Sequence, residues 1–74
     1  MLRLNVLVQL RAHEVRSAYK TISEIKGVRR VNRVAGAYDV IAYAELDSVN
    51  ELKGFMDIVR LMPGFIHADT CVAL

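Results

Sequence analysis

Two junctions of the same form divide this sequence into two similar halves. They are Ile25-Lys26-Gly27-Val28 and Met62-Pro63-Gly64-Phe65, each with a glycine shortly before an apolar residue that can begin a strand. Glycine readily adopts positive φ after the last turn of a helix, and proline cannot continue a helix. Each half is therefore predicted to contain a helix followed by a strand.

The first half also predicts a strand before its helix. Apolar residues occupy every second position from Leu2 to Leu10, which is the period of a strand. Leu7 interrupts the alternation, which indicates that the second face of this strand is partly covered. An amphipathic helix is predicted over about residues 13–26. The core stripe of this helix is predicted to be Val15, Ala18, Tyr19, Ile22 and Ile25.

The residues between the two helices predict a β-hairpin. Val28–Ala35 is rich in β-branched residues, Tyr38–Leu46 is apolar, and only Gly36-Ala37 separates them. A glycine-containing link this short favours two antiparallel strands joined by a turn.

A second helix and a last strand follow the hairpin. Ser48 and Glu51 form a capping-box pattern at the start of the helix, with Asp47 as an alternative cap. Alternating apolar residues over Phe65–Leu74 predict the last strand. The apolar stripe of the helix is predicted to be Val49, Leu52, Met56 and Val59, flanked by Phe55.

The order strand–helix–strand–strand–helix–strand predicts one domain over residues 1–74 with an α+β fold, a ferredoxin-like βαββαβ sandwich. Right-handed crossovers place both helices on one face of an antiparallel sheet. Leu7, Ile41 and Tyr43 are expected on the opposite face, which the chain does not cover. Such an apolar face is expected to pack against that of a second copy related by a two-fold axis.

Composition restricts the class of protein further. Of the 74 residues 54% are hydrophobic, and the net charge is +2. A domain this small buries only about 60% of its unfolded surface, so the excess of apolar side chains also favours an oligomer. The charge is too low for a strong polyanion binder. A cytoplasmic protein with no membrane partner is expected, because no apolar run has transmembrane length and no signal peptide is evident.

The link between the hairpin strands carries the most informative polar groups. Gly36 can turn successive backbone N–H groups toward one point, which makes a small anion site. Asp39 can accept hydrogen bonds from an ammonium group. Together they suit the charged end of an amino acid. The alternative is a turn in which Asp39 caps backbone N–H groups, and turn chemistry explains every residue in this segment.

The same residues carry a family resemblance over Val6 to Leu74. Gly36-Ala37-Tyr38-Asp39 follows a β-branched strand and precedes an apolar strand, a helix that ends at Leu61-Met62-Pro63-Gly64, and a strand with Thr70. This arrangement resembles the effector-binding domain of the Lrp/AsnC family, also called the regulation of amino-acid metabolism domain.

The resemblance implies a homodimer formed through the sheets, further association of dimers up to an octamer of four dimers, and an amino acid bound where subunits meet. It implies effector contacts at Gly36, Ala37, Tyr38, Asp39 and Thr70. Full-length family members begin with a helix-turn-helix domain, whereas the first element here is a strand. A stand-alone form is therefore expected, which binds no nucleic acid itself and modulates transcription through assembly with a DNA-binding relative.

Other polar groups have ordinary explanations. Arg29, Arg30 and Arg33 suggest RNA binding, but the third strand lacks the aromatic pattern of that module, so a solvated or interface strand is favoured. His67 and Asp69 share one strand face and are too few for a closed zinc site. They are expected to be surface or interface groups, where the histidine would make assembly sensitive to pH.

Cys71, the single cysteine, is expected to be a small buried residue, and Tyr19 and Met56 are expected to be packing residues.

The sequence predicts no enzyme, cofactor or metal, because it holds no convincing nucleophile–base arrangement and no phosphate or dinucleotide loop. We expect an effector-binding module that senses a small molecule at subunit contacts. Two alternatives stay open. One is a small dimeric ferredoxin-like enzyme of monooxygenase or isomerase type, which requires an inward-facing cavity. The other is an assembly domain with no ligand.

Overall fold

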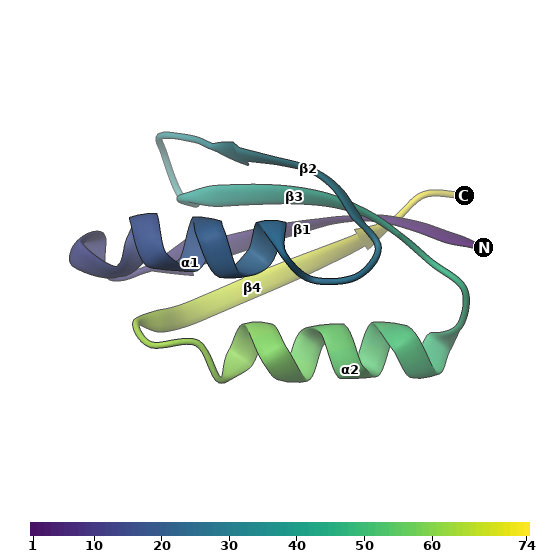
Figure 1. Ribbon diagram of the computed structural model, residues 1–74. Helices are drawn as coiled ribbons and strands as arrows, with labels where there is room; N and C mark the ends of the chain where they lie inside the picture. Colours follow the sequence, from purple (N-terminus) through teal and green to yellow (C-terminus); the bar gives the residue numbers. More distant parts are fainter.

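The computed structural model describes residues 1–74 and consists of one antiparallel sheet with two helices on one face (Figure 1). The strand order is β2-β3-β1-β4. The elements are β1 (Leu2–Leu10), a 3-10 helix (Ala12–Glu14), α1 (Val15–Ser23), β2 (Val28–Arg33), β3 (Val40–Leu46), α2 (Val49–Arg60) and β4 (Phe65–Val72). This architecture confirms the predicted α+β ferredoxin-like βαββαβ sandwich.

Both glycines at the junctions have positive φ, 94° at Gly27 and 82° at Gly64. At Gly27 a side chain would also have no room, because its Cβ would lie 2.5 Å from the Leu46 side chain and 2.8 Å from the Glu45 carbonyl oxygen. Two constraints thus require glycine where α1 turns into β2. The α-helix is shorter than the predicted range of residues 13–26, because its first residues belong to the separate 3-10 helix and it ends at Ser23.

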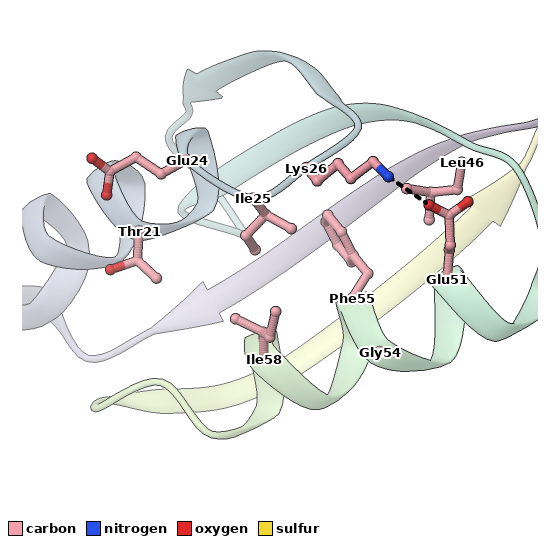
Figure 2. A pocket seen from close by; sticks show the side chains of 9 residues that line it. All are labelled: Thr21, Glu24, Ile25, Lys26, Leu46, Glu51, Gly54, Phe55 and Ile58. Carbon is pink, nitrogen blue, oxygen red and sulfur yellow. Dashed lines mark ion pairs between the residues drawn. The ribbon is translucent and has the colours of Figure 1, made fainter.

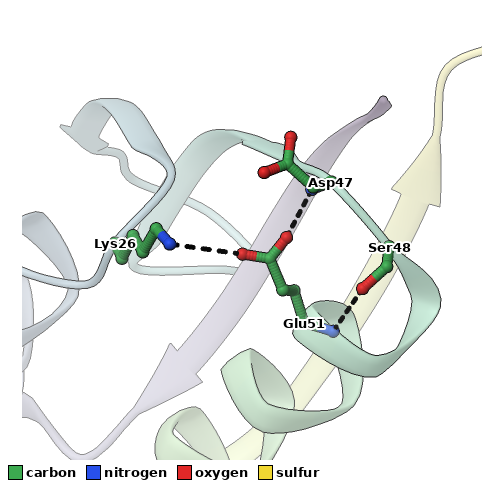
Figure 3. Close-up of polar contacts among 4 residues, drawn as sticks. All are labelled: Lys26, Asp47, Ser48 and Glu51. Atoms are coloured by element: carbon green, nitrogen blue, oxygen red, sulfur yellow. Dashed lines mark hydrogen bonds and ion pairs between the residues drawn. The ribbon is translucent and has the colours of Figure 1, made fainter.

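The side chains of Ser48 and Glu51 both accept hydrogen bonds from backbone N–H groups at the start of α2 (Figure 3). The Ser48 hydroxyl accepts a hydrogen bond from the Glu51 N–H at 3.2 Å, as predicted for the N-cap. The Glu51 carboxylate accepts a hydrogen bond from the Asp47 N–H at 2.6 Å and lies 3.9 Å from the Lys26 ammonium. The predicted capping box therefore forms with the backbone of Asp47 as its second donor.

The core fills the space between the sheet and the helices. Its buried members are Leu4, Val6, Val8, Leu10, Val15, Ala18, Ile22, Val40, Ala42, Ala44, Leu46, Phe55, Met56, Val59 and Met62. The predictions for Tyr19, Val49 and Phe55 were wrong in detail. Tyr19 is 37% exposed at the rim of the core and Val49 is 70% exposed in the first turn of α2, whereas Phe55 is fully part of the core.

The opposite face of the sheet has no helix over it, as predicted. Leu7 of β1 pairs with Ile41 of β3 on one side and with Asp69 of β4 on the other. Leu7, Ile41 and Tyr43 are half-buried by their neighbours on this face. We call this surface the open sheet face. Cys71 also lies on this face, opposite Asn5, and is exposed, which contradicts the predicted burial, because β4 is an edge strand and no helix covers this side of the sheet.

Candidate functional site

The link between β2 and β3 is longer than predicted. The strands end at Arg33 and begin again at Val40, so residues 34–39 form an irregular segment in place of a two-residue turn. The Val34 N–H donates to the Asp39 carbonyl at 2.9 Å, and the Asp39 N–H donates to the Val8 carbonyl at 2.9 Å. The link is therefore closed at its base and anchored to the central strand β1.

Asp39 forms part of that anchor with its side chain. One carboxylate oxygen accepts a hydrogen bond from the Leu10 N–H at 2.8 Å, where the β1–β4 register shifts between Gln9 and Leu10. The β1–β3 ladder ends at Val8 and Val40, and the carboxylate takes the place of the next ladder acceptor for this N–H. Asp39 thus caps a backbone N–H group, as the alternative interpretation of the sequence predicts, but the N–H is that of Leu10 on β1 and not one of the turn itself.

The tip of the link carries unbonded backbone donors. Gly36 has φ 129°, a region that favours glycine, and Gly36 and Ala37 are exposed. No backbone hydrogen bond outside the helices and strands is donated by residues 35–38. Free N–H groups can bind the carboxylate of an amino acid, and the Asp39 carboxylate that follows them in the chain can bind its ammonium group.

Tyr38 points from this link across the sheet to β4. Its hydroxyl donates a hydrogen bond to the Asp69 carboxylate, and the His67 imidazole lies 3.2 Å from the other oxygen of that carboxylate. The Tyr38 and His67 rings stack with their centroids 6.4 Å apart. The three side chains form one polar cluster at the margin of the open sheet face.

The cluster shifts the acidity of two of its members. The hydrogen bond from Tyr38 lowers the pKa of the Asp69 carboxyl below its usual range, and the nearby His67 adds to this effect. The same hydrogen bond raises the pKa of the Tyr38 phenol. Asp69 is therefore held as an anion by its neighbours.

Thr70 does not join the other predicted site residues within one chain. It pairs with Val6, whose side chain is in the core, so it lies on the helix-facing side of β4. Its hydroxyl lies 3.5 Å from the Met56 sulfur, next to a shallow groove of about 430 Å³ along α2. Gly36, Ala37, Tyr38 and Asp39 are contiguous, whereas Thr70 is on the other face of the sheet.

Two of the three clustered arginines, Arg29 and Arg30, contact side chains of β3 on the open sheet face, whereas Arg33 pairs with the core residue Val40 and lies on the helix-facing side. Arg29 forms an ion pair with Glu45 at 3.0 Å, and the Arg30 guanidinium lies 5.8 Å from the centre of the Tyr43 ring. The Tyr43 hydroxyl also donates to Glu45 at 3.2 Å. The sequence favoured a solvated or interface strand, and these contacts within the chain are compatible with both.

A second groove, of about 490 Å³, runs between α1 and α2 (Figure 2). Its apolar lining is Ile25, Leu46, Phe55 and Ile58, and it opens to the surface of the helix layer. Neither groove is the inward cavity that an enzyme of the ferredoxin-like type requires. No group of three His, Cys, Asp or Glu side chains is arranged to hold a metal ion, and neither helix has the length and apolar content needed to cross a membrane.

Comparison with known structures identifies several chains with this architecture. FFRP-DM1 is 25% identical, with a TM-score of 0.92 and 100% coverage of both chains. A protein from Thermus thermophilus is 29% identical, with a TM-score of 0.84 over 100% of this chain and 94% of that one. A transcriptional regulator from Neisseria meningitidis, solved in complex with L-Met, is 20% identical, with a TM-score of 0.83 over 99% of this chain and 49% of its own.

The third likeness concerns the fold alone, and this chain spans about half of that regulator. No curated protein matches the chain. The family model of the Lrp/AsnC ligand binding domain matches residues 4–74, which include the hairpin, the polar cluster and Thr70. The chain therefore belongs to the Lrp/AsnC ligand-binding domain family.

Proposed function

We propose that this chain is an effector-binding module that binds an amino acid beside the link between β2 and β3. The observation that carries the proposal is the run of backbone N–H groups in residues 35–38 that donate no backbone hydrogen bond, followed directly in the chain by Asp39, whose carboxylate is bound through one oxygen to the Leu10 N–H. The N–H groups suit the ligand's carboxylate, and the second oxygen of Asp39 suits its ammonium group. The Neisseria meningitidis regulator in complex with L-Met supports this class of ligand.

The ligand site is proposed to lie at a contact between subunits. Two copies are proposed to pack through their open sheet faces, where Leu7, Ile41 and Tyr43 present half-buried apolar surface. Thr70 of the same chain faces the helices and does not lie at the link. Further association of these dimers, up to an octamer, is therefore proposed to bring Thr70 of a neighbouring subunit toward the link.

The biological role is proposed to be regulatory and not enzymatic. The family is one of ligand-binding domains, and the match to the Neisseria meningitidis protein is to a transcriptional regulator. Binding of an amino acid would favour the assembled state by mass action and would act on transcription through mixed assembly with a DNA-binding relative in the cytoplasm.

A thermal-shift panel of the twenty amino acids tests the proposed site. A ligand at about 100 times its dissociation constant adds about 2.7 kcal/mol of stability. A selective rise in melting temperature with one side-chain class supports the proposal. No rise with any amino acid at millimolar concentration contradicts it and favours an assembly domain without such a ligand.

A further inference from the structure

The groove beside Thr70 carries positive charge and no negative charge. Figure 1 shows α2 running alongside the edge strand β4, and the groove between them has a volume of about 430 Å³. We call it the Thr70 groove, and its lining residues are Val49, Leu52, Lys53, Met56, Arg60 and Thr70. The groove between α1 and α2 is lined by Glu24 and Glu51 as well as Lys26. The two grooves therefore suit ligands of different charge, and the Thr70 groove suits an anion.

The two cations of the Thr70 groove have weak partners or none within the chain. Lys53 is exposed and forms no ion pair. Arg60 forms one long ion pair, at 3.9 Å, with Asp57 of the same helix, and both side chains are 60% exposed. Exposed pairs of this kind contribute little to stability. Both cations can therefore bind a ligand without the loss of a strong contact.

The spacing along α2 places these cations on either side of the Thr70 hydroxyl. Lys53, Met56 and Arg60 follow the three- and four-residue spacing of one helix face, over about 10 Å of the helix axis. Met56 lies between the two cations, and its sulfur is the only hydrogen-bond partner of the Thr70 hydroxyl, at 3.5 Å. A thioether sulfur is a weak acceptor, so the hydroxyl is free to donate to a stronger one. An anionic oxygen bound to this hydroxyl would have a cation on each side.

The rest of the groove is apolar. Met56 is buried, Leu52 is half-buried, and Val49 is 70% exposed one turn before Lys53. Methylene groups of a ligand can cover these side chains while a charged end stays beside the cations. The groove therefore suits a short aliphatic chain that ends in a carboxylate, which an arginine can bind through two N–H groups.

We propose that the effector is an amino acid with an acidic side chain, glutamate or aspartate, whose side-chain carboxylate binds Lys53, Arg60 and Thr70 of the neighbouring subunit. This inference rests on the proposed function, which places the head group at the link of one subunit and brings Thr70 of another toward it. The Thr70 groove comes with that residue, because Thr70 is part of its lining. The link then binds the groups that all amino acids share, and the groove selects the side chain.

Glutamate and glutamine test the charge, because the two ligands have nearly the same size and shape. Isothermal titration calorimetry of the wild-type protein is expected to give glutamate an affinity about tenfold or more above that of glutamine, as for hydrogen bonds to a charged group. Lys53→Met and Arg60→Met keep an unbranched side chain and remove its charge. Each is expected to weaken glutamate binding by about tenfold and to change glutamine binding little, so that the double variant binds both ligands alike.

The matched control is the double variant Arg16→Met and Lys20→Met, which removes the same charge from exposed positions of α1 outside the groove. This control should keep the preference for glutamate. If it loses the preference as fully as the groove variant, the net charge of the protein attracts the ligand and the inference is overturned. Circular dichroism checks that every variant is folded.

A mixture of chains tests whether the link and the groove come from different subunits. Asp39→Asn alters the link, and the double variant Lys53→Met and Arg60→Met alters the groove. When the two chains are refolded together from denaturant, some sites combine an unaltered link from one subunit with an unaltered groove from another. Recovery of high-affinity glutamate binding is expected, and a mixture that binds no better than its separate components would overturn the inference.

The choice of ligands separates this inference from the proposed function. Tight binding of a neutral amino acid, with weaker binding of both glutamate and aspartate, leaves the proposed site in place and overturns the acidic effector. Equal affinity of the wild-type protein for glutamate and glutamine does the same. If no amino acid binds, the inference and the proposed function both fail.

Discussion

Asp39 has a structural role and a proposed ligand role, and two substitutions separate them. Asp39→Ala removes the acceptor of the Leu10 N–H, which the carboxylate binds at 2.8 Å. Leaving such a group unpaired costs about 1–3 kcal/mol. Because 1 kcal/mol shifts the melting temperature of a domain this small by about 4–8 °C, we expect a fall of about 4–24 °C. Asp39→Asn keeps an acceptor oxygen and should lose less, about 1 kcal/mol.

The stabilisation by ligand is expected to depend on the negative charge of Asp39, which the asparagine variant lacks. Loss of a hydrogen bond to a charged group costs about 1.5–3 kcal/mol, which is more than tenfold in affinity. At a ligand concentration that gives the wild-type protein about 2.7 kcal/mol of stabilisation, a tenfold weaker site gives about 1.4 kcal/mol. Asp39→Asn should therefore lose at least about half of its ligand-induced stabilisation while its own fold remains nearly intact.

Thermal unfolding of both variants, with and without the amino acid that the panel selects, measures the two effects in one experiment. If Asp39→Asn keeps the full ligand shift, the ammonium group does not bind Asp39 and the carboxylate is only a backbone cap. If Asp39→Ala melts with the wild-type protein, the hydrogen bond to Leu10 contributes nothing measurable to stability.

Three further substitutions test individual contacts. Gly27→Ala should lower stability by about 2 kcal/mol or more in denaturant unfolding, because positive φ and the nearby Leu46 both oppose a side chain; an unchanged midpoint would contradict this. Gly54→Ala should instead raise stability by about 1 kcal/mol, and a fall would show that Gly54 has an unrecognised structural role. The Tyr38–Asp69 hydrogen bond raises the pKa of the phenol and lowers the pKa of the carboxyl. The stability that this bond contributes is therefore lost when the pH rises above the pKa of Tyr38 or falls below the pKa of Asp69. Asp69→Asn should accordingly lower the phenolate absorbance midpoint of Tyr38, and an unchanged midpoint would count against the bond.

The order of elements could be predicted because it depends on local patterns. Period-two alternation in β1 and the glycines at the ends of the helices are properties of neighbouring residues. The same patterns place a side chain on a helix only to within about one position in the turn. That is why the pattern puts Tyr19 in the core stripe and Phe55 beside it, whereas Phe55 is buried in the core and Tyr19 is 37% exposed at its rim.

The polar cluster could not be predicted because it depends on strand register. Tyr38 and Asp69 are 31 residues apart, and β1 lies between the strands that they adjoin. Alternation in β4 indicates that His67, Asp69 and Cys71 share a face, but only pairing with β1 decides that it is the open one. The same choice of face separates Thr70 from the link, which a resemblance along the chain does not reveal.

The separation of Thr70 from the link makes the proposed subunit-contact site testable without knowledge of the assembly. If the ligand needs groups from two subunits, ligand binding and assembly are linked, and each must strengthen the other by the same factor. The apparent dissociation constant should then fall as protein concentration rises through the range where dimers associate, and Leu7→Glu should weaken ligand binding although Leu7 lies outside the link. Equilibrium dialysis across a hundredfold range of protein concentration measures this dependence. A dissociation constant that stays the same across that range, in wild type and in Leu7→Glu, would mean that residues 36–39 of one chain form the whole site and that Thr70 has no part in it.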